Sequence, residues 1–246
     1  MRGRSIRLSP MRKLVVDLTR LRAPTVPVQR VMDLESVVAA RVRLNDRPPW
    51  VAIFVKAYAL LSEEMPILRR AYVKLPTPRL YEYPETAASI VIERDFGDEM
   101  AILTLLMHNP ARLGVEEIGR QIRHAKTAPV GEIKSFKRML DLARWPTPLR
   151  RLIWWLGLNV GRQRGNYFGS FGFTVYSGLG AESLHPLSPL TATLNYGVIG
   201  KDGRVTVRMI YDHRVLDGSD VARALERLEA KLTGEVTAEL KALAGA

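Results

Sequence analysis

The sequence predicts one α/β domain in which strands and helices alternate. Alternate residues of 205–211 are apolar, and those between them are mostly polar or basic, which is the two-residue period of a half-buried strand. Downstream, apolar residues recur at helical spacing from Val221 to Leu232. The chain has 246 residues and is 47% hydrophobic, so it can bury a sizeable core. We therefore expect a single domain over residues 1–246.

The predicted elements follow one another along this domain. Residues 1–30 are basic and punctuated by proline, which indicates an arm packed on the domain. Residues 33–41 and 50–64 are predicted to be helices, and the second is mostly apolar, so we expect it to be buried on more than one side. Residues 71–107 are predicted to alternate as strands, and residues 115–122 to begin an amphipathic helix.

Residues 134–164 combine basic residues with tryptophans and are predicted to be helical. Pro146 and Pro148 predict a split into two helices. The apolar part, residues 152–161, is too short to span a bilayer, which takes about 20 residues. We expect the tryptophans to fill a substrate pocket or a subunit interface. The alternative is a peripheral contact of residues 145–161 with a membrane surface.

Glycines punctuate residues 165–180. The run lacks the Gly-Lys-Ser/Thr ending of a phosphate-binding loop and the dinucleotide fingerprint. We therefore expect these glycines to allow bulges and close backbone approach in a strand. Residues 190–199 and 205–211 predict a hairpin around the turn Lys201-Asp202-Gly203.

The net charge of +12 favours an anionic partner, although an excess of arginine is also typical of the nucleotide composition of some genomes. A positive field would steer a polyanionic ligand, for example the phosphates of coenzyme A or an acidic carrier protein. No recognition motif accompanies the charge, which argues against nucleic acid. The absence of cysteine excludes a disulfide framework and a thiol nucleophile. No signal peptide is visible, so we expect a cytoplasmic protein.

Residues 211–218 carry the candidate chemistry. His213 and Asp217 are four residues apart where the predicted strand joins the predicted helix. Histidine titrates near neutral pH and can therefore accept a proton as a general base. Asp217 can orient the imidazole or cap the helix, and the spacing leaves both roles open. The other histidines, His108, His124 and His185, show no ligand spacing, so we expect no metal site.

The run from Asp212 to Gly218 resembles the Asp-His-Arg-x-x-Asp-Gly signature of the 2-oxoacid dehydrogenase acyltransferases, also called dihydrolipoamide acyltransferases, which are related to chloramphenicol acetyltransferase. Residues 8–13, 49–57 and 173–180 are similar to the opening segment, the first buried helix and the Thr-Ile-Ser-Asn-Leu-Gly stretch of that family. The resemblance implies a chloramphenicol acetyltransferase-like fold, an α+β sandwich whose mixed central sheet is flanked by helices. It also implies a homotrimer with the active site at the subunit interface.

The resemblance implies a role for each site residue. His213 is the expected general base, and Ser177 the expected donor to the oxyanion. Asp217 is expected to hold the shape of the site through an ion pair with an arginine. The alternative oxyanion donors are Ser170, Thr174 and Tyr176, and the candidate arginines are Arg12, Arg20 and Arg214.

The implied activity is transfer of an acyl group from a thioester to a thiol, hydroxyl or amine. The sequence lacks the lysine in an acidic turn that carries a lipoyl group, so we expect a stand-alone catalytic domain without lipoyl or subunit-binding domains. The expected co-substrate is an acyl-coenzyme A or an acyl carrier protein thioester. Two alternatives stay open: a non-catalytic trimeric assembly core of the same fold, and a protein that binds a membrane surface or a polyanion.

Overall fold

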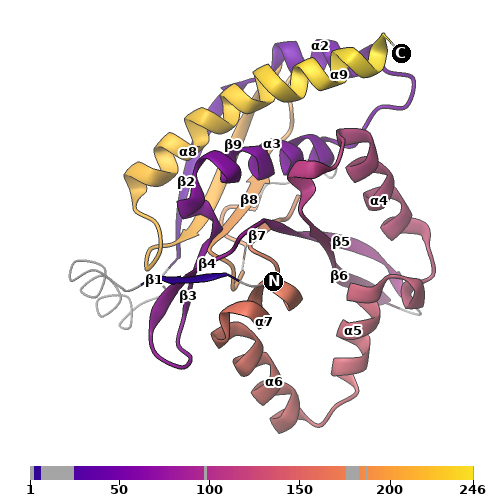
Figure 1. The fold of residues 1–246 in the computed structure, drawn as a ribbon. Coiled ribbons are helices and arrows are strands. Elements are labelled where there is room, and N and C mark those ends of the chain that lie inside the picture. Colours follow the sequence, from indigo (N-terminus) through magenta and orange to yellow (C-terminus); the bar gives the residue numbers. More distant parts are fainter. Residues whose placement is uncertain (1–2, 7–24, 97–98, 176–182, 187, 246) are drawn as a thin grey trace.

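A six-stranded mixed sheet forms the centre of the fold in the computed structural model, which describes residues 3–6, 25–96, 99–175, 183–186 and 188–245 (Figure 1). In spatial order, its strands are β2 (Thr25–Asp33), β9 (Arg204–Asp212), β8 (Ala192–Tyr196), β7 (Phe171–Phe173), β5 (Ala87–Phe96) and β6 (Glu99–His108). Strand β7 pairs in parallel with β5 and β8, and the other pairs are antiparallel. The mixed central sheet that the sequence predicts is therefore confirmed.

A smaller antiparallel sheet lies beside the central one. Its order is β1 (Arg4–Ile6), β4 (Arg79–Glu82) and β3 (Arg70–Val73). Strand β2 begins inside the segment 1–30 that the sequence analysis assigns to an arm, and it pairs with β9 over nine residues. The last part of that segment is thus a strand of the central sheet.

Helix α3 (Trp50–Glu64) packs against one face of the central sheet. Phe54 stacks on Tyr196 of β8 with ring centroids 4.4 Å apart, and Tyr58 contacts Phe171 of β7 at the same distance. The helix also packs against α4 (Val115–Thr127) and α8 (Gly218–Lys231), while α2 (Glu35–Val42) packs against α9 (Thr237–Ala244). The predicted helix at 50–64, buried on more than one side, is confirmed.

Lys56 is a charged residue on the buried part of this helix. Its Nζ donates hydrogen bonds to the carbonyl oxygens of Ala111 (2.6 Å) and Leu113 (2.8 Å) and lies 4.0 Å from the carboxylate of Glu239. A buried ammonium group is tolerated when its protons have acceptors. Lys56 therefore ties α3 to the segment before α4 and to α9.

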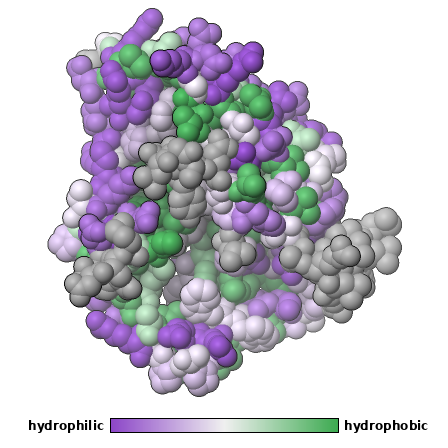
Figure 2. All heavy atoms as spheres, turned by 180° about the vertical axis from the view of Figure 1, so that it is seen from behind, coloured by the Kyte–Doolittle hydropathy of each residue, from purple (hydrophilic) through white to green (hydrophobic). Residues whose placement is uncertain are grey.

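The two faces of the central sheet differ in polarity. Residues paired across a ladder share a face, so the strand register assigns each side chain to one face or the other. The face toward α3 carries Phe171, Phe173, Leu194, Tyr196 and Val207, which are apolar or aromatic and buried. The opposite face carries Ser89, Thr193, Asn195, Arg208 and Asp212, which are also buried. Figure 2 shows the rear of the molecule, with hydrophilic residues along its upper and left margins and exposed hydrophobic residues toward its middle.

The hairpin predicted around Gly203 is confirmed, since β8 and β9 pair in antiparallel fashion. Gly203 has φ +79°, and a Cβ atom there would lie 2.5 Å from the backbone nitrogen of Glu35. The strand expected over the glycines of 165–180 is wrong in its first part, because Gly165 lies in helix α7 (Gly161–Tyr167). Gly161 and Gly165 are four residues apart and face Tyr81 and Tyr83, so they permit close approach between a helix and aromatic rings.

Residues 134–164 form three helices at the end of the molecule that lies farthest from α9 (Figure 1). They are α5 (Lys134–Ala143), α6 (Thr147–Asn159) and α7. The predicted break at Pro146 and Pro148 is confirmed. Trp145, Trp154 and Trp155 are each 46–47% exposed, so they do not fill a pocket of their own chain. In the described part of the chain no helix combines the length and the apolar character that a membrane span requires.

Candidate active site

His213 lies on the short connection between β9 and α8. Strand β9 ends at Asp212, whose backbone N–H donates to the carbonyl of Thr191 (2.8 Å). Val215 and Leu216 donate back to the Asp212 carbonyl, and both side chains are buried in the core. The connection is therefore fixed on both sides of His213, whose side chain is 37% exposed. This arrangement leaves the imidazole accessible on a rigid support.

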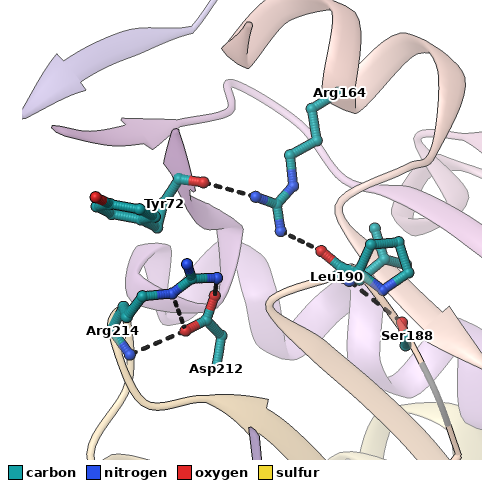
Figure 3. A network of polar contacts seen from close by, with 7 residues as sticks. Tyr72, Arg164, Ser188, Leu190, Asp212 and Arg214 are labelled. Carbon is teal, nitrogen blue, oxygen red and sulfur yellow. Dashed lines mark hydrogen bonds and ion pairs between the residues drawn. The ribbon is translucent and has the colours of Figure 1, made fainter. Parts of the chain in front are cut away.

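Asp212 and Arg214, which flank His213 in the sequence, form an ion pair that we call the clamp (Figure 3). Arg214 donates from Nε to Oδ1 (2.8 Å) and from Nη2 to Oδ2 (2.7 Å) of the Asp212 carboxylate, and its backbone N–H donates to Oδ1 (3.0 Å). The Asp212 side chain is only 3% exposed. Burial lowers the pKa of Arg214, but the hydrogen bond and charge of Asp212 outweigh that effect and raise it.

Tyr72 and Arg164 extend this cluster, and neither was singled out from the sequence. The Arg214 guanidinium lies 4.6 Å from the centre of the Tyr72 ring, a cation–π contact. Arg164 is buried and donates to the carbonyl oxygens of Tyr72 (2.6 Å) and Pro189 (Figure 3). Burial lowers the pKa of Arg164, and the nearby groups of Tyr83 and Asp212 oppose that shift. The cluster joins β3, α7 and the end of β9.

Asp217 is the N-cap residue of α8. Its backbone N–H donates to the carboxylate of Asp220 (3.2 Å), and the two residues form a capping box. Its Oδ1 lies 3.5 Å from Nδ1 of His213, and its side chain is 48% exposed. The predicted helix cap is confirmed. Among the candidate arginines, Arg214 pairs with Asp212, while Arg12 and Arg20 lie outside the described residues.

Tyr211 supports the other side of the imidazole. Its ring centre is 5.6 Å from that of His213, and its side chain is buried on the α3 face. Burial raises the pKa of Tyr211, and the charges of Asp217 and Asp220 raise it further. Tyr211 therefore stays a neutral aromatic side chain at neutral pH and packs beside the imidazole.

The candidate oxyanion donors differ in what the structure says of them. Ser177 and Tyr176 lie outside the described residues. The Ser170 hydroxyl is buried. It accepts a hydrogen bond from the backbone N–H of Ala87 (2.8 Å) and donates one to the carbonyl oxygen of Ala87 (3.2 Å). Ser170 therefore holds β7 beside β5, and its hydroxyl is engaged by the backbone. Thr174 is buried directly after β7.

No group of three or more histidine, aspartate or glutamate side chains that could hold a metal ion occurs in the described ranges. The arrangement around His213 instead offers a partly exposed imidazole, a carboxylate near its Nδ1 and an accessible opposite edge. Such an arrangement suits proton transfer to or from a substrate.

No protein-family model matches the sequence, and no curated protein matches it. Solved structures do match over nearly the whole chain. A probable dihydrolipoamide acetyltransferase from Listeria monocytogenes is 18% identical, with a TM-score of 0.59 and coverage of 93% of this chain and 94% of that chain. Chloramphenicol acetyltransferase is 13% identical, with a TM-score of 0.58 and coverage of 93% and 100%.

A third similar structure is that of the Azotobacter vinelandii dihydrolipoamide acetyltransferase. It is 16% identical, with a TM-score of 0.61 and coverage of 94% of this chain and 92% of that chain. The Azotobacter structure was solved to investigate the role of a serine, a histidine and an asparagine in the catalytic mechanism of that enzyme. In its sequence the asparagine follows the histidine by four residues. The protein has the α/β fold shared by dihydrolipoamide acetyltransferase catalytic cores and chloramphenicol acetyltransferase.

Proposed function

We propose that the protein is an acyltransferase that moves an acyl group from a thioester to a thiol, hydroxyl or amine, with His213 as general base. The observation that carries the proposal is the position of His213, accessible on a connection held by the Asp212–Arg214 clamp and the core residues after it. The same four-residue interval separates His213 from Asp217 and the histidine from the asparagine in the Azotobacter enzyme. The shared fold supports the proposal further.

The chemistry follows from the two edges of the imidazole. Nδ1 faces the Asp217 carboxylate, which leaves Nε2 for the substrate. Nε2 takes the proton of the acceptor as its thiol, hydroxyl or amine attacks the thioester carbonyl. The tetrahedral intermediate collapses, the bond from carbonyl carbon to sulfur breaks, and the protonated imidazole returns the proton to the leaving thiolate.

The negative charge on the tetrahedral intermediate requires a hydrogen-bond donor. We assign that role to the Ser177 hydroxyl, on the resemblance of residues 173–180 to the acyltransferase family. The same resemblance underlies a homotrimer in which His213 of one subunit faces Ser177 of its neighbour. The donor is an acyl-coenzyme A or a carrier-protein thioester, whose phosphates the net charge of +12 would attract.

The His213→Ala variant should lose at least about 100-fold in rate, which is the ordinary scale of general-base catalysis. Its Tm should stay near that of the parent, because the side chain is 37% exposed. The measurement is thiol release from acyl-coenzyme A of graded chain length with thiol, hydroxyl and amine acceptors. The matched control is His124→Ala, an exposed histidine on α4, which should keep full activity. Near-normal turnover by His213→Ala would exclude the mechanism.

Replacing Asp217 separates its cap from its charge. Asp217→Ala removes the N-cap and should lower the free energy of unfolding by about 1 kcal/mol, with a fall in activity. Asp217→Asn should keep most of the stability, because asparagine is an equally good N-cap. Chemical denaturation and the thiol-release assay give both values. If the alanine variant is as stable as the parent, the structural role is wrong; if the asparagine variant is as inactive as His213→Ala, the carboxylate charge acts on the imidazole directly.

Breaking the ion pair between Asp212 and Arg214 should lower activity, because that pair fixes the backbone on both sides of His213. Asp212→Asn leaves Arg214 without its counter-charge and should cost roughly 3 kcal/mol of stability, because one partner of a buried pair is lost. At a temperature where the variant is folded, kcat should fall while KM for the thioester changes little. The control is Asp46→Asn. The Asp46 carboxylate is exposed, and its Oδ2 lies 2.7 Å from Nη2 of Arg123, the same distance as between Oδ2 of Asp212 and Nη2 of Arg214. This control should lower the free energy of unfolding by under about 1 kcal/mol. Equal losses in both variants would contradict the positioning role.

The shared site predicts complementation between inactive subunits. A trimer that mixes His213→Ala and Ser177→Ala chains contains an interface where both residues are wild type. Mixing the two variants under subunit-exchange conditions should therefore restore part of the activity, and either variant alone should not recover. Light scattering gives the oligomeric state. A monomer, or no recovery despite demonstrated exchange, would leave a site contained within one chain.

A further inference from the structure

Helix α6 exposes a continuous apolar stripe. Leu149, Leu152 and Leu156 are separated by three and four residues, so they lie on one side of the helix. They are 41%, 51% and 40% exposed, and Trp155 beside them is 47% exposed. Trp145, directly before the helix, is 46% exposed. An apolar patch of this kind on a folded protein marks a surface that another phase or molecule covers.

The opposite side of α6 is fixed to the domain. Gly157 approaches Phe168 so closely that a Cβ atom would lie 3.0 Å from the ring, and Trp154 meets the same ring edge-on. At the end of the helix, the N–H of Leu75 donates to the carbonyl of Asn159 (3.1 Å). The stripe is therefore held outward by packing on the other side of α6.

Basic residues accompany the stripe along the chain. The segment 134–164 contains Lys134, Lys137, Arg138, Arg144, Arg150, Arg151, Arg162 and Arg164 against the single acid Asp141. Of these, Arg164 is buried and Arg150 donates to the carbonyl of Ala143 (3.1 Å). Lys137, Arg151 and Arg162 are exposed. The patch thus combines leucine and tryptophan with a nearly unopposed positive charge.

We infer that α6 docks the protein on an anionic lipid surface, with the leucine stripe and Trp155 in the boundary between headgroups and acyl chains and the basic residues against lipid phosphates. A helix that lies in this boundary needs an apolar face, tryptophan and flanking arginine or lysine, and α6 with α5 provides each of them. The 13 residues of α6 are too few to cross a bilayer but sufficient to lie along its surface. The inference is independent of the acyltransferase activity.

Two other partners, a second copy of the chain and nucleic acid, fit the patch less well. A second copy that docked through the same patch would bring two copies of the segment 134–164 face to face, each with eight basic residues against one acid. Nucleic acid would satisfy the arginines but has no use for a stripe of leucines. An anionic bilayer matches both the charge and the apolar stripe.

Co-sedimentation of the full chain with vesicles tests the inference. The protein should bind vesicles of phosphatidylcholine mixed with phosphatidylserine, bind pure phosphatidylcholine weakly, and bind the mixed vesicles less at high ionic strength. The chain supplies its own probe, because three of its four tryptophans, Trp145, Trp154 and Trp155, lie in this segment. Their fluorescence should shift to the blue on binding and be quenched by brominated acyl chains.

Paired variants separate the apolar from the electrostatic contribution. The Leu152→Ala/Trp155→Ala variant should weaken binding to mixed vesicles by on the order of tenfold or more, because two apolar side chains no longer enter the bilayer. Lys137→Gln/Arg151→Gln should also weaken it by on the order of tenfold and reduce the effect of salt. The matched control is Val198→Ala/Lys201→Gln, which removes an exposed apolar side chain and one charge from the β8–β9 connection and should bind like the parent.

Three outcomes would overturn the inference. The first is equal loss of binding in the control and the α6 variants, which would reduce the effect to net charge. The second is absence of vesicle binding by a correctly folded parent. The third is an oligomer that dissociates in Leu152→Ala/Trp155→Ala while vesicles stay unbound, which would assign the stripe to a second copy. Circular dichroism confirms that each variant is folded.

Discussion

The ion pair between Asp212 and Arg214 is the constraint on which the candidate site depends. It joins the last residue of β9 to the second residue of the following connection, so the backbone at His213 cannot reorient without breaking two charge-assisted hydrogen bonds. The Asp212 carboxylate is buried, and the Arg214 guanidinium is partly covered by the Tyr72 ring and lies near Arg164. A buried pair of this kind adds little net stability over apolar residues, but it specifies one conformation. Here that conformation is the one that holds the imidazole at the surface.

The polarity of the central sheet explains how charged groups can lie so deep in the domain. Helix α3 covers an apolar face, so its own residues are almost uniformly apolar, and Lys56 is accommodated only because its ammonium group finds backbone carbonyls. The other face carries polar side chains that continue to Asp212. Arg208 on that face donates to Gln29 (2.8 Å) across the pair of β9 and β2. The candidate site thus lies at the end of the polar face of the sheet, and the opposite face packs against α3 in the core.

Features with a local physical cause could be predicted from the sequence. The helix at 50–64 follows from its apolar composition, the hairpin from the turn at Gly203, and the break between α5 and α6 from two prolines. Features that depend on distant partners could not. Gly161 and Gly165 leave room for the rings of Tyr81 and Tyr83, which lie some 80 residues earlier in the sequence. Strand β2 is defined by its pairing with β9, which lies far along the chain.

The candidate site divides in the same way. The position of His213 between strand and helix and the cap at Asp217 are confirmed, because both follow from the local sequence. The sequence analysis names Arg214 as a candidate partner of Asp217, but Arg214 pairs with Asp212 and lies over the ring of Tyr72, a residue distant in the sequence. Arg164 had no sequence signal, because its acceptors are backbone carbonyls from two other segments. The role of Ser177 stays a prediction.

The pairing of β2 with β9 also orders the events of folding. During synthesis β2 leaves the ribosome long before β9, which lies about 180 residues later and is the one strand that pairs with β2 among the residues that the structure describes. Closing so long a loop delays the contact, and until then β2 presents an unpaired edge that is open to association with other chains. The clamp around His213 sits at the end of that late strand. The geometry of the candidate site is therefore completed late, and a chain that stops before β9 contains the core helix α3 but not the candidate site.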